Sequence, residues 1–135
     1  MSEAQYLDQV PGAREFVALR AAAGLSVNTI AAAEAGLRGS WYSVCVRVGA
    51  ELIGMGRIIG DGGCFFQIVD IAVRPDYQGQ GIGYGIMERL MKRLREDAPE
   101  SAYVSLIADG GASRLYSKFG FEFTAPASAG MALRL

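Results

Sequence analysis

Apolar positions near the start of the chain recur three and four residues apart, which predicts two helices. Residues 15–23 combine strong helix formers with apolar side chains at this spacing. After Gly24, either Asn28 or Thr29 is placed to cap a second, alanine-rich helix that reaches about Gly36. We therefore expect the chain to begin with two consecutive helices before any strand.

Three strand patterns come next. Residues 40–48 alternate between apolar and polar positions and are rich in β-branched and aromatic side chains. A turn at 49–51 leads into a second strand over 52–60. Residues 64–73 form a nearly continuous apolar run, which is typical of a strand at the centre of a sheet. Because short turns join these strands, we expect them to pair antiparallel.

The second half of the chain alternates helices and strands. Residues 81–97 place their apolar side chains on one helical face. A strand over 102–108 and a short helix over 112–119 follow, and two last apolar runs, 121–124 and 131–135, are predicted as strands. This order of elements predicts an α/β fold around one mixed sheet.

Length, composition and charge narrow the class of protein. With 135 residues, 51% of them hydrophobic and 20% charged, residues 1–135 fit a single globular domain. A formal net charge of -1 without a basic block argues against nucleic acid as a partner. No run approaches the ~20 apolar residues that a membrane-spanning helix needs, so we expect no membrane partner.

The N-terminal residues and the cysteines suggest where the protein works. Residues 1–16 mix acidic and polar side chains and lack the apolar run of a secretory signal. Cys45 and Cys64 lie in strand-like segments without metal-ligand spacing, so we interpret them as reduced thiols. Both features predict a cytoplasmic protein.

The chain contains no histidine. This excludes Ser-His-Asp and Cys-His nucleophilic machinery, and it removes imidazole from any metal site. We expect no bound metal. Any acid–base chemistry must use carboxylate, tyrosine, cysteine, lysine, water or the backbone.

A glycine-rich turn at residues 78–83 follows the central strand and opens the long helix. Its glycines let the backbone approach a ligand closely, and the first helical turn offers amide N–H groups and a positive dipole end to an anion. A Walker loop is excluded because no Gly-Lys-Ser/Thr ending is present, and a GxGxxG fingerprint fails at Tyr84 and at Ile86. The alternative is a turn that only joins strand to helix.

Two segments of the chain resemble the GNAT N-acetyltransferase superfamily. Residues 69–90 resemble its acetyl-CoA motif, and the characteristic positions of that motif are Gln78, Gly81 and Gly83. Residues 112–123 resemble its C-terminal helix, with Tyr116 four residues before a Gly-Phe pair. The resemblance implies a GNAT-like α/β fold, with a mixed, mostly antiparallel central sheet flanked by helices. It also implies an acetyl-CoA-dependent acyltransferase.

The resemblance also implies a cofactor site. Pantetheine is expected along the backbone of the central strand at Ile71, Ala72 and Val73, in the manner of an added strand. The diphosphate is expected on the turn formed by Gln78, Gly79, Gln80, Gly81, Ile82, Gly83 and Tyr84. Asp109 takes the place of an asparagine that often contacts pantetheine in the family. Its alternative role is to cap the helix that begins near residue 112.

Two further residues are expected to carry the chemistry. Tyr116 resembles the residue that protonates the departing CoA thiolate, and its alternative is a packed core tyrosine. Gln67 stands where many family members have a glutamate base, and an amide cannot take a proton. Asp70, on the same strand, is then the candidate base, acting through water or holding the ammonium. Its alternative is a structural carboxylate bound to backbone or to an arginine.

The resemblance leaves the partner open. We expect direct acetyl transfer to a primary amine of a small molecule, and a homodimer is a further expectation. A peptide or protein amine is one alternative. A non-catalytic module that binds acyl-CoA is the other, and Gln67 in place of a base is the feature that favours it.

Overall fold

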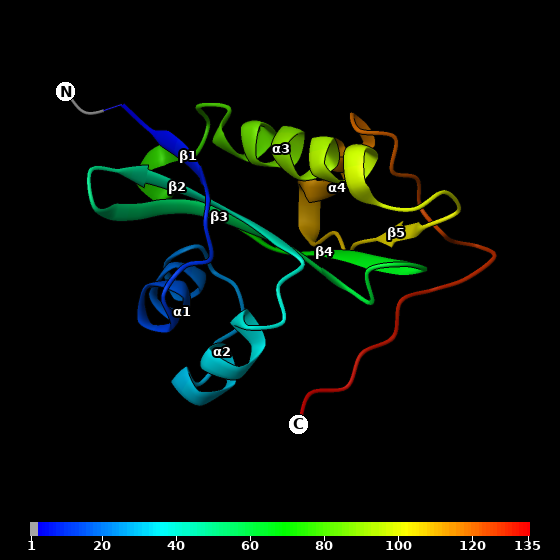
Figure 1. Cartoon of the computed structure of the whole chain (residues 1–135), viewed down its shortest axis with the longest axis horizontal. Coiled ribbons are helices and arrows are strands. Elements are labelled where there is room, and N and C mark those ends of the chain that lie inside the picture. The colour runs from blue at the N-terminus through cyan, green and yellow to red at the C-terminus, as the bar shows by residue number, and fades with distance from the viewer. Residues whose placement is uncertain (1–2) are drawn as a thin grey trace.

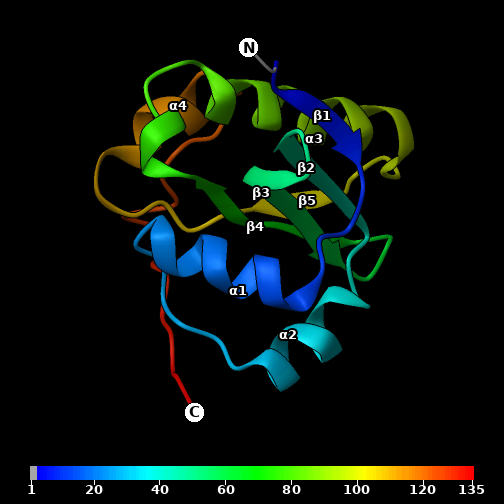
Figure 2. The same ribbon diagram turned by 90° about the vertical axis from the view of Figure 1, so that its left-hand side faces the viewer.

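The structure is a computed structural model that describes residues 3–135. A five-stranded sheet in the order β1-β2-β3-β4-β5 forms the middle layer. Helices α1 and α2 cover one face of the sheet, and α3 and α4 cover the other (Figures 1 and 2). The strands are β1 (Gln5–Asp8), β2 (Tyr42–Val48), β3 (Glu51–Gly60), β4 (Phe65–Val73) and β5 (Tyr103–Ser105), and the helices are α1 (Ala13–Ala22), α2 (Ile30–Leu37), α3 (Ile82–Asp97) and α4 (Ser113–Ser117), with short 3-10 turns at Pro75–Tyr77 and Gly110–Ala112.

The predicted fold class is confirmed. Strands β1 to β4 pair antiparallel, and only β5 runs parallel to its neighbour, with Phe65 opposite Tyr103 and Gln67 opposite Ser105. The sheet is therefore mixed and mostly antiparallel. Thr29 caps α2, since its Oγ1 accepts a hydrogen bond from the Ala32 amide at 3.1 Å.

Three expectations about strands are wrong. Strand β1 was not expected, because four residues are too few to show a pattern until β2 provides a partner. The strand predicted over 102–108 is paired only over Tyr103–Ser105. Residues 121–124 and 131–135 form no strand, since no other segment of residues 3–135 pairs with them. Apolar alternation alone does not make a strand without a neighbour.

Helix α3 packs closely on the sheet. Its buried face includes Ile82, Ile86 and Leu90. A Cβ added to Gly56 of β3 would lie only 2.6 Å from Ile86 Cγ2 and 3.2 Å from Leu90 Cδ1. A side chain at this strand position would push the helix away, so glycine is required by the close approach.

A β-bulge in β4 changes which residues face each layer. The register between β3 and β4 shifts between Met55 and Arg57. Ile68 and Ile71 both pack in the cluster under α3, whereas Val69 and Asp70 both line a pocket under α1 and α2. Two consecutive side chains thus lie on one face, which regular alternation forbids. Asp70 adopts a left-handed φ of 61° to allow this.

Candidate active site

Strands β4 and β5 separate after three paired residues. Within residues 3–135, no strand partners the β5 side of β4 beyond Gln67. A cavity of about 490 Å³ opens at this divergence, a volume in the range of small-molecule sites. Its wall comes from β4, β5, α4 and the C-terminal segment, and includes Gln67, Tyr103, Ser105, Leu106, Tyr116 and Phe121. The backbone edge of β4 leads from this cavity towards the glycine-rich turn.

The turn between β4 and α3 leaves backbone amides at the start of α3 without a hydrogen-bond partner within residues 3–135. Gly79 and Gly81 have φ values of 78° and 82°, and an added Cβ would meet nothing within 4 Å at either position. Conformation, and not packing, therefore requires glycine there. The first helical bond runs from the Gly85 amide to the Gly81 carbonyl at 3.0 Å, and no side chain caps the helix. The amides of residues 82–84 are left for an anion.

The next two glycines have a different origin. An added Cβ at Gly85 would lie 2.8 Å from Tyr6 Cζ, and one at Gly83 would lie 3.5 Å from Leu115 Cδ2. Gly85 thus makes room for the Tyr6 ring of β1, and Gly83 lies against α4. Tyr6 belongs to the unexpected strand, so the sequence offered no signal for this contact.

Tyr116 of α4 is half-buried at the wall of the cavity. It packs against the core cluster under α3 and lines the cavity, as Gln67 does. Burial raises the pKa of the Tyr116 hydroxyl above its usual value, and the nearby Asp109 carboxylate adds to this rise. The hydroxyl is therefore fully protonated at neutral pH and available as a donor. The structure brings two of the expected residues, Gln67 and Tyr116, to one cavity.

Asp70 lies elsewhere. Its side chain is only 7% exposed and faces α1 and α2, outside the residues that line the cavity. One carboxylate oxygen accepts a hydrogen bond from Arg20 Nη1, and the other accepts one from Arg57 Nε at 2.8 Å. Of the two roles expected for Asp70, this geometry favours the structural, arginine-bound carboxylate over the base.

The two arginines are functional candidates that the sequence analysis missed. Arg57 interrupts the apolar run of β3, and a charged residue inside a buried strand is a signal that a partner must exist. Arg20 carries no such signal, since a single arginine in a surface helix is ordinarily solvated. Only the packing of α1 on β4 brings it to Asp70.

Asp109 is exposed and does not line the cavity. Its side chain makes no capping hydrogen bond to the turn Gly110–Ala112, although its backbone carbonyl accepts one from the Ala112 amide at 3.0 Å. The helix-capping alternative is therefore not realised by the carboxylate. The Asp109 carboxylate instead acts on Tyr116 through its charge, which raises the pKa of the Tyr116 hydroxyl.

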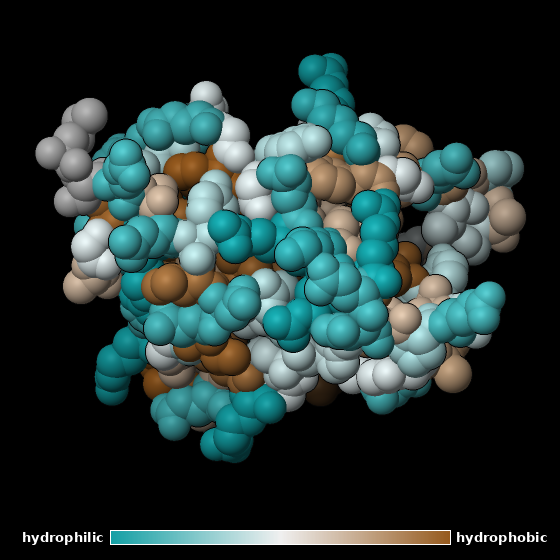
Figure 3. All heavy atoms as spheres, turned by 45° about the horizontal axis from the view of Figure 1, so that its top comes forward, coloured by the Kyte–Doolittle hydropathy of each residue, from teal (hydrophilic) through white to brown (hydrophobic). Residues whose placement is uncertain are grey.

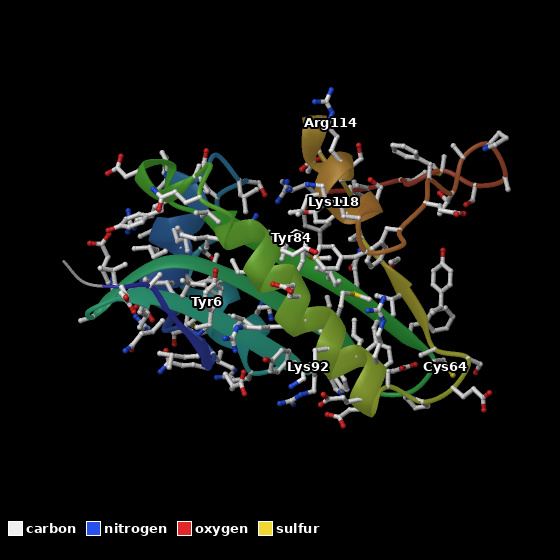
Figure 4. All side chains as sticks on the ribbon, turned by 90° about the horizontal axis from the view of Figure 1, so that it is seen from above. Tyr6, Cys64, Tyr84, Lys92, Arg114 and Lys118 are labelled. Carbon is white, nitrogen blue, oxygen red and sulfur yellow. The ribbon has the colours of Figure 1, made fainter. Side chains whose placement is uncertain are left out.

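Basic side chains lie on α4 and directly after it, beside α3. In Figure 4, Lys118, the residue that follows α4, lies close to Tyr84 of α3, whereas the Arg114 side chain of α4 points away from α3. The rings of Tyr84 and Phe119 are 4.8 Å apart and join the two helices, and Lys118 lines the groove between them together with Gly81. Hydrophilic side chains gather over this α3 face of the molecule (Figure 3). The helix start thus lies in a polar surface with positive charge nearby.

The described residues include neither a cluster of metal ligands nor a membrane-spanning helix. Residues 3–135 contain no cluster of three or more histidine, cysteine, aspartate or glutamate side chains that could hold a metal ion. None of the helices in this part of the chain has the length and apolar character that a bilayer crossing requires.

Residues 19–132 match the family model described as "Acetyltransferase (GNAT) domain". Among solved structures, the chain is similar to a protein of unknown function from meticillin-resistant Staphylococcus aureus, described as a probable acetyltransferase. The two share 48% identity and a TM-score of 0.95 over 98% of this chain and 100% of that one. A GNAT family acetyltransferase from Brucella melitensis, solved in complex with acetyl-CoA, shares the fold at 19% identity and a TM-score of 0.67, over 91% of this chain and 85% of that one.

A curated relative gives a partial match. The chain is 36% identical over 71 residues to an uncharacterized N-acetyltransferase from Porphyra purpurea. The matched segment covers 53% of this chain and 40% of that protein. The matched part thus spans less than half the length of that relative.

Proposed function

Because the chain belongs to the GNAT acetyltransferase family, we propose that it transfers the acetyl group of acetyl-CoA directly to a primary amine of a small molecule. The observation that carries this proposal is the cavity where β4 and β5 separate. Tyr116 lines this cavity, and the free edge of β4 connects it to the uncapped start of α3.

Acetyl-CoA is proposed to lie along this path. The pantetheine pairs with the backbone of Ile71, Ala72 and Val73, on the side of β4 that no strand within residues 3–135 occupies. The diphosphate accepts hydrogen bonds from the turn of residues 78–84. Charge-assisted bonds of this kind contribute about 1.5–3 kcal/mol each. Asp109 then lies near the pantetheine end and tunes Tyr116 electrostatically.

The chemical step forms the C–N bond and breaks the C–S bond. The neutral amine attacks the thioester carbonyl, which a backbone N–H of β4 polarises. The attacking nitrogen then loses a second proton to solvent water as the C–S bond breaks, which yields the amide and the CoA thiolate. Tyr116 donates a hydrogen bond to the sulfur as the thiolate departs. Its raised pKa keeps the hydroxyl protonated but makes full proton transfer to the thiolate uphill, so the proposed role is that of a hydrogen-bond donor. No covalent enzyme intermediate is needed. Burial raises the pKa of Cys45 to about 11, which makes this thiol a poor nucleophile.

The acceptor must lose a proton before it attacks. For an alkylamine with a pKa near 10.4, this costs about 4.6 kcal/mol at pH 7. Gln67 is an amide, and both oxygens of Asp70 already accept hydrogen bonds from guanidinium groups. We propose that solvent water takes the proton, and that Asp70 positions Arg20 and Arg57.

Free thiol release tests this function. The protein is incubated with acetyl-CoA and a panel of primary amines, and CoA thiol is followed with time. Thiol release that depends on one class of amine is the expected result. Tight CoA binding without thiol release for any amine would favour the alternative, a non-catalytic acyl-CoA-binding module. Gln67 in the place of a base is the feature that supports this alternative.

We further propose a homodimer formed through the C-terminal segment. Met131, Leu133 and Leu135 alternate along it and are 94%, 88% and 112% exposed, which is unusual for apolar side chains. Light scattering after gel filtration is expected to give twice the 14.4 kDa mass of the chain. A cytoplasmic location is also proposed, and the two free cysteines support it. A fluorescent fusion imaged in cells checks this location.

A further inference from the structure

A second pocket lies under α1 and α2, against β4. It has a volume of about 330 Å³, and we call it the arginine pocket after three of its lining residues, Arg20, Arg57 and Arg134. Asp70 is the only acidic side chain among the residues that line it, so the lining carries a formal charge of +2. A pocket with this charge favours an anion.

Arg57 supplies the strongest reason for a ligand. Its side chain is 10% exposed, its Nε binds Asp70, and its Nη1 donates to the Gly36 carbonyl at 3.2 Å and to Ser40 Oγ at 2.9 Å. Its Nη2 makes no hydrogen bond with any part of the chain that the structure describes. The Arg57 side chain is thus nine-tenths buried, while Nη2 is not among the buried polar atoms without a partner and so remains accessible from the pocket. An accessible N–H group of a charged guanidinium can bind an anion there.

Arg134 lies across the same pocket. It is exposed, and its one hydrogen bond within residues 3–135 runs from Nη2 to Ser26 Oγ at 3.1 Å. Arg20 is different, because all three of its nitrogens are used, on Asp70 and on Ser26. Nitrogens without a partner in the described residues are therefore found on Arg57 and Arg134. A guanidinium group can bind both oxygens of a carboxylate through two parallel N–H···O hydrogen bonds.

The arginine pocket and the cavity share strand β4. Val69 lines the arginine pocket, and Gln67 lines the cavity. The two side chains lie two residues apart, and before the bulge they share a face of the sheet. At about 3.3 Å per residue, the Cα atoms of Gln67 and Val69 are roughly 7 Å apart along the strand. A short carbon chain spans this distance.

We infer that the acceptor carries a carboxylate, which binds Arg57 and Arg134 in the arginine pocket while its amine reaches the cavity. The inference rests on the proposed acetyl transfer and names the class of acceptor, a small amino acid-like molecule. Asp70 holds Arg20 and Arg57 in place beneath it. The amine end enters the cavity that Gln67 and Tyr116 both line.

The test uses ω-amino carboxylates of two to six carbons, each paired with its carboxamide. Initial rates with acetyl-CoA are compared within each pair. Calorimetry with the N-acetyl derivatives of the same pairs measures binding without turnover. We expect at least one carboxylate to exceed its carboxamide by at least about tenfold, in both kcat/KM and affinity, as the loss of a charge-assisted hydrogen bond predicts.

Arg134→Gln is the main variant, since this exposed residue makes one hydrogen bond and its loss leaves the core intact. It is expected to remove most of the carboxylate preference while CoA affinity stays unchanged. Arg38→Gln is the matched control, because Arg38 is exposed directly after α2 and lies outside the residues that line the pocket. Arg57→Lys keeps the charge but loses the Nη2 donor, and a thermal melt verifies that it is folded.

Three results would overturn the inference. The first is equal binding of carboxylates and carboxamides at every chain length, and the second is an equal effect of Arg134→Gln and Arg38→Gln. Acetylation limited to peptide amines would overturn it as well. Carboxylate binding without any thiol release would leave the anion pocket standing and reject the proposed acetyl transfer instead.

Discussion

At the scale of single residues, the environment of Tyr116 decides what it can do. The hydroxyl lies at the cavity wall, half-buried, with a pKa raised by burial and by Asp109. Asp70 shows the opposite case, because two arginines occupy its carboxylate. A tyrosine and an aspartate can both transfer protons, but here the surroundings leave only Tyr116 available for this role.

Replacing Tyr116 by phenylalanine is expected to lower kcat by about 10²-fold, the lower end for a lost general acid. The affinity for acetyl-CoA should change little, since the ring keeps its packing. Steady-state kinetics and CoA calorimetry measure the two quantities. Tyr103→Phe is the control, because Tyr103 also lines the cavity but is exposed. Equal losses of rate and affinity would identify Tyr116 as a packing residue only.

At the scale of elements, the turn before α3 shows how one short segment meets two requirements. Gly79 and Gly81 take left-handed conformations that leave the helix start uncapped. Gly83 and Gly85 instead let α4 and β1 approach the helix. The glycine cluster is therefore partly a ligand-binding feature and partly a packing feature, which the glycine spacing alone does not reveal.

Gly81→Val is expected to weaken CoA binding at least about tenfold, because the branched side chain disfavours the left-handed φ that exposes the amides. Gly24→Val is the matched control. Gly24 has the same φ of 82° and nothing within 4 Å of an added Cβ, but it follows the C-terminal end of α1 and not the start of α3. Both variants should lose similar stability, about 1–3 kcal/mol. Unchanged CoA affinity in Gly81→Val would reject the diphosphate site.

At the scale of the whole molecule, the two layers of helices meet the sheet through different chemistry. The α3 layer is apolar and close-packed, whereas the α1 and α2 layer includes a buried carboxylate and its two arginines. Tyrosines of β1 and β2 lie at the edge of the α3 layer. Arg89 and Arg93 of α3 stack over the rings of Tyr6 and Tyr42, at 4.7 and 4.2 Å from their centroids.

These tyrosines predict how stability depends on pH. Burial and the Asp8 carboxylate raise the pKa of Tyr42 to about 12, and burial raises the pKa of Tyr6. A pKa raised in the folded state means that the unfolded chain loses its proton first, near 10. Stability should therefore be constant below pH 10 with respect to these groups and fall between about pH 10 and 12.

Thermal melts from pH 8 to 11.5 measure this fall. Tyr42→Phe is expected to make the melting temperature decline less steeply above pH 10, because it removes one proton released on unfolding. Tyr103→Phe, at an exposed tyrosine without a resolved contact to a carboxylate, is the comparison. Identical slopes in all three proteins would contradict the assignment.

Local sequence patterns were enough to predict the parts of the fold that depend on short-range geometry. The amphipathic spacing of α3, the apolar run of β4 and the glycines at 79 and 81 follow from short-range geometry, and these segments are where they were expected. The acetyl-CoA motif also lies within one stretch of chain, so its resemblance to the family was visible.

Tertiary structure decided everything that depends on distant neighbours. Strand β1 exists because β2 lies beside it, and residues 121–124 and 131–135 form no strand because no segment described by the structure pairs with them. The roles of Asp70 and Gly85 follow from Arg20 and Tyr6, which are far from them along the chain. Pairing, ion pairs and close packing act between residues that only the fold brings together.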